Sequence, residues 1–241
     1  MKLRFFDDFD RIVIVSLPYR TDRRRDMVRE LRRVNLQDDP RVQFFDAYSL
    51  ESRGCFRSVG SHGCYMSHLA ILTEAGEARQ RVLVLQDDCQ FLPGILSYRM
   101  PEGTDVFYGG FRASDPADLK NSNIAGAHFM GFSADAARAA SRYLSDLLQL
   151  TIPPDAKAAA ETEFDPAIRP PIDGALVWFR RAHPQFKTEF KLLGIQRSSR
   201  SDVEPKRLDM VWGARRLVDA VRKVKSRSSS MFAWRGAPPH S

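Results

Sequence analysis

Apolar residues along the chain fall into short continuous runs that alternate with segments of helical spacing. The runs expected to form strands cover residues 11–17, 42–45, 82–86, 105–108 and 128–132. Continuous apolar runs of this length are typical of strands buried on both faces of a mainly parallel sheet. Their alternation with helical segments predicts a doubly wound α/β fold.

Four segments between these runs are expected to be helical: residues 21–34, 67–80, 133–148 and 174–181. In the first, Met27, Leu31 and Val34 share one face, and Thr21 is placed to cap the start. Ser133 is placed in the same way before the third. Residues 46–62 and 112–124 lack a period and are expected to be loops. Residues 151–171 contain five prolines and are expected to form a long irregular connection.

Composition agrees with one large globular domain. The chain has 241 residues, of which 43% are hydrophobic and 28% charged. We expect this domain to cover residues 1–205. No apolar run reaches the 18 residues of a membrane span, and the three cysteines lack metal-site spacing. Three free cysteines predict a cytoplasmic protein.

The net charge of +7 arises in the last fifth of the chain, where residues 197–241 hold 11 Lys and Arg against 4 Asp and Glu. Residues 206–225 have the period of a basic amphipathic helix, which either packs on the domain or lies on an anionic membrane surface. Residues 226–241 have no such period and are expected to be a disordered tail. The charge also raises nucleic-acid binding as an alternative, although no stacking or recognition motif supports it.

Paired carboxylates follow the central apolar run, in the sequence Gln86-Asp87-Asp88. The carboxyl end of such a strand is where open α/β sheets bind ligands. Two acidic side chains there are costly unless they meet a cation, and carboxylates together with substrate phosphates commonly hold Mg²⁺ or Mn²⁺. The alternative is that the pair belongs to a solvated turn.

Five segments, taken in order, resemble glycosyltransferase family 25, the lipooligosaccharide and procollagen galactosyltransferase group. The resemblance spans residues 11–204. It is carried by Ile12 to Arg24, which includes Leu17-x-x-Arg20-x-Asp22-Arg23, by Gly63-Cys64-x-x-Ser67-His68 before the Asp87-Asp88 strand, by Ala127 to Ser133, by Pro171-Ile172-Asp173, and by Gln196 to Val203.

The resemblance implies a glycosyltransferase A-type fold and an inverting transfer of hexose. The implied donor is UDP-galactose or UDP-glucose, and the implied acceptor is a surface glycan such as bacterial lipopolysaccharide. Asp88 would hold Mn²⁺ or Mg²⁺, Asp87 would contact the donor sugar or ribose, and Asp173 would be the general base. For Asp173, helix capping is the alternative role.

The resemblance also places Leu17, Arg20, Asp22 and Arg23 at the donor nucleotide, since arginine forks suit a diphosphate. The alternative for these residues is a basic helix start that faces water. Two further residues, Ser67 and His68, are expected to shape the donor site rather than to do chemistry. His128, inside an apolar run, is expected to be structural.

One departure from the family concerns Gln86, because the family usually has Glu-Asp-Asp at these positions. A glutamine offers a carbonyl oxygen to a cation but no charge, so metal affinity is expected to fall. This leaves open a catalytically degenerate protein that binds a nucleotide sugar or a glycan without transferring it.

Overall fold

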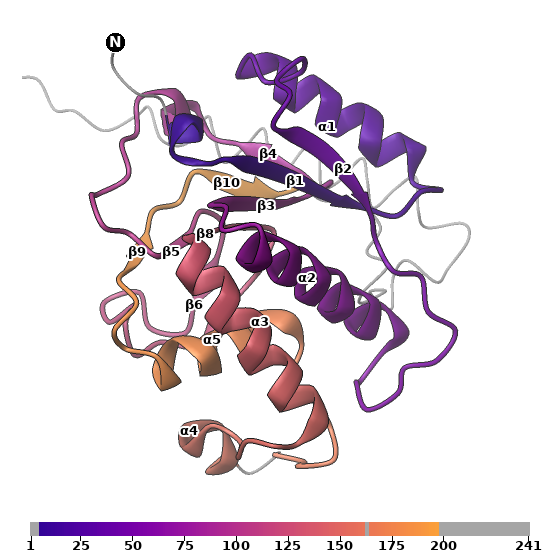
Figure 1. The fold of residues 1–241 in the computed structure, drawn as a ribbon, viewed down its shortest axis with the longest axis vertical. Coiled ribbons are helices and arrows are strands. Elements are labelled where there is room, and N and C mark those ends of the chain that lie inside the picture. The colour runs from indigo at the N-terminus through magenta and orange to yellow at the C-terminus, as the bar shows by residue number, and fades with distance from the viewer. Residues whose placement is uncertain (1–4, 162–163, 198–241) are drawn as a thin grey trace, which may run out of the picture. The chain divides into compact units, whose positions relative to one another are not determined.

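A six-stranded sheet with the order β2-β1-β3-β8-β5-β9 forms the centre of the described domain (Figure 1). The computed structural model describes residues 5–161 and 164–197. The sheet strands are β1 (Arg11–Ser16), β2 (Val42–Asp46), β3 (Val82–Gln86), β5 (Val106–Tyr108), β8 (Phe129–Phe132) and β9 (Thr188–Phe190). Only β8 among these six runs antiparallel to its neighbours, so the expected mainly parallel α/β sheet is confirmed.

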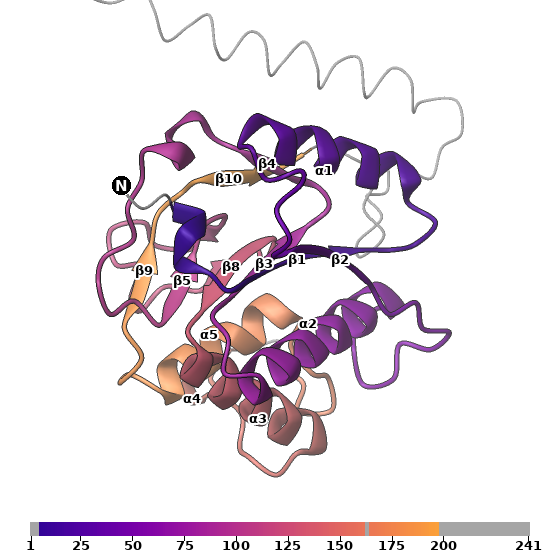
Figure 2. The ribbon, with the colours of Figure 1, turned by 45° about the horizontal axis from the view of Figure 1, so that its top comes forward.

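Helices cover both faces of this sheet, as a doubly wound fold requires (Figure 2). On one face lies α1 (Thr21–Arg33), and on the other lie α2 (Val59–Glu77), α3 (Ala134–Gln149) and α5 (Ile172–Ala182). The short helical elements are η1 (Phe5–Asp8), η2 (Pro93–Leu96) and α4 (Ala156–Ala159). None of the described helices combines the length and the apolar character that crossing a membrane demands.

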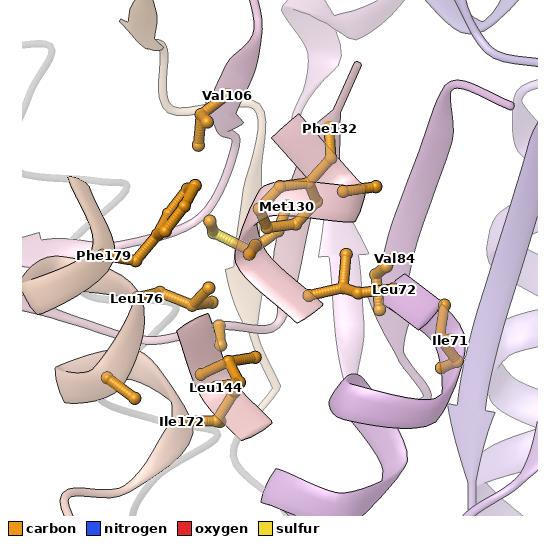
Figure 3. Close-up of a cluster of buried hydrophobic side chains, with 14 of the residues drawn as sticks. Ile71, Leu72, Val84, Val106, Met130, Phe132, Leu144, Ile172, Leu176 and Phe179 are labelled. Atoms are coloured by element: carbon orange, nitrogen blue, oxygen red, sulfur yellow. The ribbon is translucent and has the colours of Figure 1, made fainter. Parts of the chain in front are cut away.

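The continuous apolar runs are explained by burial on both faces. In β1, Val13 and Val15 join the core under α2, α3 and α5, whereas Ile12 and Ile14 join the core on the α1 side. Neighbouring side chains of a strand point to opposite faces, so both sets must be apolar. Figure 3 shows the first core, where Met130 of β8 lies among side chains of the helices.

The second helix begins at Val59, eight residues earlier than the sequence predicts. The Ser58 side chain caps it by accepting a hydrogen bond from the backbone of Ser61. Small residues start this helix and leave no apolar period to detect, and Gly63 is needed because a Cβ there would collide with the Tyr48 carbonyl oxygen. The predicted Thr21 cap is also wrong, since Arg20 occupies the cap position of α1 and makes no side-chain cap bond.

Two small antiparallel sheets were not predicted. One pairs β4 (Cys89–Phe91) with β10 (Gly194–Gln196), and the other pairs β6 (Arg112–Ala113) with β7 (Ile124–Ala125) at the two ends of the loop predicted over residues 112–124. Strands of two or three residues carry too little periodicity to detect. The expected helix over 206–225 and the tail over 226–241 lie outside the described residues, as does the end of the expected domain over 1–205.

Candidate functional site

Asp87 and Asp88 directly follow β3 and are each only 4% exposed. Because β1, β2 and β3 are parallel, their carboxyl ends meet at one edge of the sheet. We call Asp87, Asp88 and the side chains bonded to them the acidic cluster. Its two buried carboxylates need partners, because an unpaired charge is costly inside a protein.

The Asp87 carboxylate is held by two groups from other segments. The Ser16 hydroxyl, at the end of β1, donates to Oδ2 over 2.7 Å, and Arg23 Nη1, in the first turn of α1, donates to Oδ1 over 3.2 Å. Burial raises the pKa of Asp87, and the Asp88 charge adds to this, whereas Ser16 and Arg23 act to lower it. Burial is the larger influence, so the charged form of this carboxylate is less favourable in the fold than in water.

The Asp88 carboxylate is only partly satisfied. Gln196 Nε2 donates to Oδ2 over 3.0 Å, and Arg23 Nη1 lies 3.5 Å from the same oxygen. The other oxygen, Oδ1, is buried and has no hydrogen-bond partner among the described residues. A buried carboxylate oxygen without a partner is the arrangement expected of a ligand for a cation.

The strand pair β4–β10 brings Gln196 and Arg197 to the acidic cluster. Arg197 donates its backbone N–H to the Asp88 carbonyl oxygen over 2.8 Å, and its side chain donates to the Asp87 carbonyl oxygen. Gln196 belonged to a matching motif but was not predicted as a site residue, and Ser16 and Arg197 were not singled out. Only the pairing of distant segments reveals them.

Gln86 turns its side-chain nitrogen toward Cys64, with Nε2 3.5 Å from Sγ. Burial raises the pKa of the Cys64 thiol to about 12, and the charges of Asp173 and Asp88 add to this effect. The thiol therefore stays protonated at neutral pH. The charges of Asp173 and Asp88 therefore both act on the Cys64 thiol.

Ser67 and His68 lie in the middle of α2, not at its start, and both are fully buried. The Ser67 hydroxyl donates to the Gly63 carbonyl oxygen and accepts from the Tyr48 backbone N–H. His68 Nδ1 lies 2.9 Å from the Cys64 carbonyl oxygen, and burial lowers the pKa of its imidazole. These bonds hold both side chains within α2 and join α2 to the backbone at Tyr48. Direct contact of either residue with a ligand stays a prediction.

Asp173 is the second residue of α5 and is half-buried. Its Oδ2 accepts the Gly126 backbone N–H over 2.9 Å, and its Oδ1 accepts the Gly174 backbone N–H over 3.0 Å. These two bonds orient the carboxylate at the helix start and tie it to the turn before β8. A carboxylate at a helix N-terminus is favoured by the helix dipole, which suits this position.

The segment after β1 contains the remaining predicted residues. Arg20 forms a two-pronged pair with Asp22, through Nε to Oδ1 over 3.0 Å and Nη2 to Oδ2 over 2.9 Å. This side-chain bonding lowers the pKa of Asp22 to about 2. Leu17 is half-buried, and its carbonyl oxygen accepts the Arg20 backbone N–H. Arg23, another predicted nucleotide residue of this segment, reaches the acidic cluster through its contacts with Asp87 and Asp88.

The acidic cluster offers a divalent cation few protein ligands. Within residues 5–161 and 164–197, no group of three or more His, Cys, Asp or Glu side chains is placed to hold a metal. Asp88 Oδ1 is the one orphaned oxygen of the acidic pair in that part of the chain. Mg²⁺ is commonly bound through one or two carboxylates plus substrate phosphates, and that mode is the one the cluster can supply.

A separate surface pocket of about 610 Å³ lies between α3, α5 and residues 152–156. Its lining includes Tyr143, Asp155 and Trp178 and none of the predicted site residues. The acidic cluster is the better candidate, because it combines buried charge with an unsatisfied ligand atom.

Comparison with known proteins gives no family assignment. No family model matches the sequence, and no curated protein matches it. A solved structure described as "crystal structure of a glycosyltransferase involved in the glycosylation of the major capsid of PBCV-1" aligns with a TM-score of 0.45 and 11% identity, over 78% of this chain and 93% of that chain. Proteins that share so little sequence can differ in function, so the assignment below rests on the site.

Proposed function

We propose that the protein is a glycosyltransferase that moves a hexose from a nucleotide-diphosphate sugar to a glycan acceptor. The observation that carries this proposal is the acidic cluster, with two buried carboxylates at the carboxyl end of β3 and one oxygen left without a described partner. Its support in the sequence is the ordered series of motifs that resembles family 25, which favours UDP-galactose or UDP-glucose as donor and lipopolysaccharide as acceptor.

The donor would lie across the carboxyl ends of β1 and β3. Its diphosphate would meet Arg20 and Arg23 at the start of α1, where backbone N–H groups also favour an anion. Asp87 would accept hydrogen bonds from the donor sugar or ribose. Leu17, Asp22, Ser67 and His68 would shape this site. Asp88, with the amide oxygen of Gln86, would hold Mn²⁺ or Mg²⁺, which supplies positive charge to the leaving diphosphate.

The acceptor would meet Asp173. Its carboxylate takes the proton of the acceptor hydroxyl while the hydroxyl oxygen forms a bond to the anomeric carbon. The bond from that carbon to the diphosphate oxygen breaks, and its electron pair leaves with the nucleoside diphosphate. Attack from the face opposite the leaving group inverts the anomeric configuration. The hydrogen bonds from Gly126 and Gly174 would hold the carboxylate in place for this step.

A protein that binds a nucleotide sugar without transferring the sugar is the second candidate. Gln86 favours it, because the amide cannot replace the charge of the usual glutamate, and its nitrogen is directed at Cys64.

Peripheral membrane contact through residues 206–225 also stays a prediction, since these residues lie outside the described part of the chain.

Incubation of the purified protein with a panel of UDP-hexoses, Mn²⁺ and glycan acceptors tests the proposal. Release of UDP that depends on the acceptor and is lost in Asp88→Asn supports transfer. Binding of a nucleotide sugar without acceptor-dependent release supports the second candidate. Failure to bind any nucleotide sugar contradicts both.

A further inference from the structure

Arg23 already places a positive charge between the two carboxylates of the acidic cluster. Its Nη1 atom lies 3.2 Å from Asp87 Oδ1 and 3.5 Å from Asp88 Oδ2. The three side chains, taken without their backbone atoms, are well buried, with side-chain exposures of 12% for Arg23 and 6% for each aspartate. Weak screening by water makes the charge of Arg23 strong at this position.

A divalent cation and Arg23 would therefore compete for Asp88. The positive charges of the cation and of Arg23 would repel each other, and the repulsion is greater in a site with little water. A metal ion that arrives alone would have to displace the Arg23 guanidinium from the carboxylates. No bound anion would then be present to pair with the displaced guanidinium. Asp88 Oδ1 is thus free to accept a cation, but the positive charge of Arg23 disfavours the binding of a cation there.

A nucleoside diphosphate offers Arg23 a second partner. Guanidinium groups form paired hydrogen bonds with phosphate as readily as with carboxylate. Arg23 is the third residue of α1, and the first turn of a helix attracts anions. Meanwhile Ser16 and Gln196 would keep one hydrogen bond on each aspartate after Arg23 has left.

We propose that Arg23 is an internal counter-ion that holds Asp87 and Asp88 until a nucleoside diphosphate draws it away and a divalent cation takes its place at Asp88. This proposal rests on the proposed function, because it takes the diphosphate of the donor as the ligand of Arg23. Binding of diphosphate and binding of cation would then strengthen each other, and such coupling must be reciprocal. Arg23 is a positioning residue in this account.

The test is to measure Mn²⁺ binding by calorimetry for the wild type, Arg23→Gln and Arg29→Gln. Arg29 is the matched control, because it lies on the same helix with its side chain 70% exposed and paired with Asp26. Without nucleotide, Arg23→Gln should bind Mn²⁺ roughly 5- to 150-fold more tightly than the wild type, the range usual for coupled sites. Arg29→Gln should match the wild type.

The wild type should bind Mn²⁺ more tightly when UDP is present and should be unaffected by uridine, which lacks the phosphates. In Arg23→Gln the gain from UDP should shrink. Equal Mn²⁺ affinity of the wild type and Arg23→Gln without nucleotide overturns the proposal. If Arg23→Gln does not fold, Arg23→Met, which also removes the positive charge, replaces it, and equal affinity there has the same meaning.

Failure of the proposed function gives a different result. A wild type that binds neither UDP nor UDP-sugars contradicts the nucleotide site itself. A wild type that binds UDP, but whose Mn²⁺ affinity is the same with UDP, with uridine and without either, contradicts the role of Arg23 alone.

Discussion

The face of the sheet covered by α2, α3 and α5, called the helix-covered face below, and the acidic cluster at the edge of the sheet are both buried. The two regions are nevertheless built in opposite ways. Under α2, α3 and α5 the side chains are apolar, and Leu72, Met130 and Leu144 are fully buried (Figure 3). Helices α2 and α3 approach closely, since a Cβ on Gly76 would lie 2.7 Å from Arg138 Cα. The acidic cluster instead buries two carboxylates.

The difference lies in what each region needs from the rest of the chain. Apolar packing is not directional, so many side chains share the stabilisation of the helix-covered face. Each carboxylate of the cluster needs specific donors, which come from β1, α1 and the segment around β10. Buried ion pairs are often close to neutral for stability. We therefore expect the helix-covered face to set stability and the edge of the sheet to set activity.

The largest expected effect is on activity and concerns Asp173. Asp173→Asn should lower the transfer rate about 10²- to 10⁴-fold, because loss of a general base removes the proton acceptor. Donor affinity should stay nearly unchanged, since the base acts on the acceptor. Steady-state kinetics and UDP binding check both parts. Wild-type turnover in this variant would exclude Asp173 as the base.

The largest expected effect on stability is at the helix-covered face. Leu144→Ala should lower the free energy of unfolding by about 2–5 kcal/mol, because it leaves a cavity in a fully buried position. Leu150→Ala is the control, since that side chain is 58% exposed and should change stability by less than about 0.5 kcal/mol. Urea denaturation measures both. If Leu144→Ala lowers the free energy of unfolding by less than about 1 kcal/mol, the helix-covered face contributes less to stability than proposed.

Asp88→Asn should separate the two regions. The amide keeps the shape of the side chain, and Arg23 retains Asp87 as a partner, so the unfolding free energy should change by no more than about 1 kcal/mol. Binding of Mn²⁺ in the presence of UDP should be lost. Urea denaturation and calorimetry give the two values. A loss above about 3 kcal/mol would instead identify Asp88 as part of a stabilising ion pair.

The smallest expected effect is a pH dependence of stability from His68. Burial lowers the pKa of His68 in the fold below the ordinary value of 6.5. As pH falls through about 6.5, the unfolded chain takes up a proton that the folded chain refuses, so stability present at higher pH is lost. The melting temperature should therefore fall between about pH 7.5 and pH 5.5.

His68→Gln should weaken this pH dependence. His128 should account for part of what remains, since burial lowers its pKa as well, although the Asp88 charge opposes this. Melting curves of both proteins across this range decide the matter. A wild-type melting temperature that does not change with pH would contradict a lowered pKa of His68 in the fold.

Long apolar runs were predictable because burial on both faces leaves a continuous mark in the sequence. The strand over residues 82–86 was predicted with its observed bounds, and the cap at Ser133 is confirmed by its hydrogen bond from Ala136. The start of α2 was missed because its first residues are mostly small and polar and have no helical period, and Gly63 among them is required by close approach to the Tyr48 carbonyl oxygen. The strands β4 and β10 were missed because each has three residues.

The sequence by itself determined five of the six strands of the central sheet, their burial on two faces and the position of Asp87 and Asp88 after the central strand, since these follow from local periodicity and chain order. It did not reveal β9, which has only three residues, or the order of the strands. It could not determine that Ser16, Arg23 and Gln196 hold the two carboxylates. Those contacts join residues between 64 and 108 positions apart. Only the tertiary structure decides them, because hydrogen bonds and ion pairs depend on distances of a few ångströms between segments that the sequence leaves unplaced.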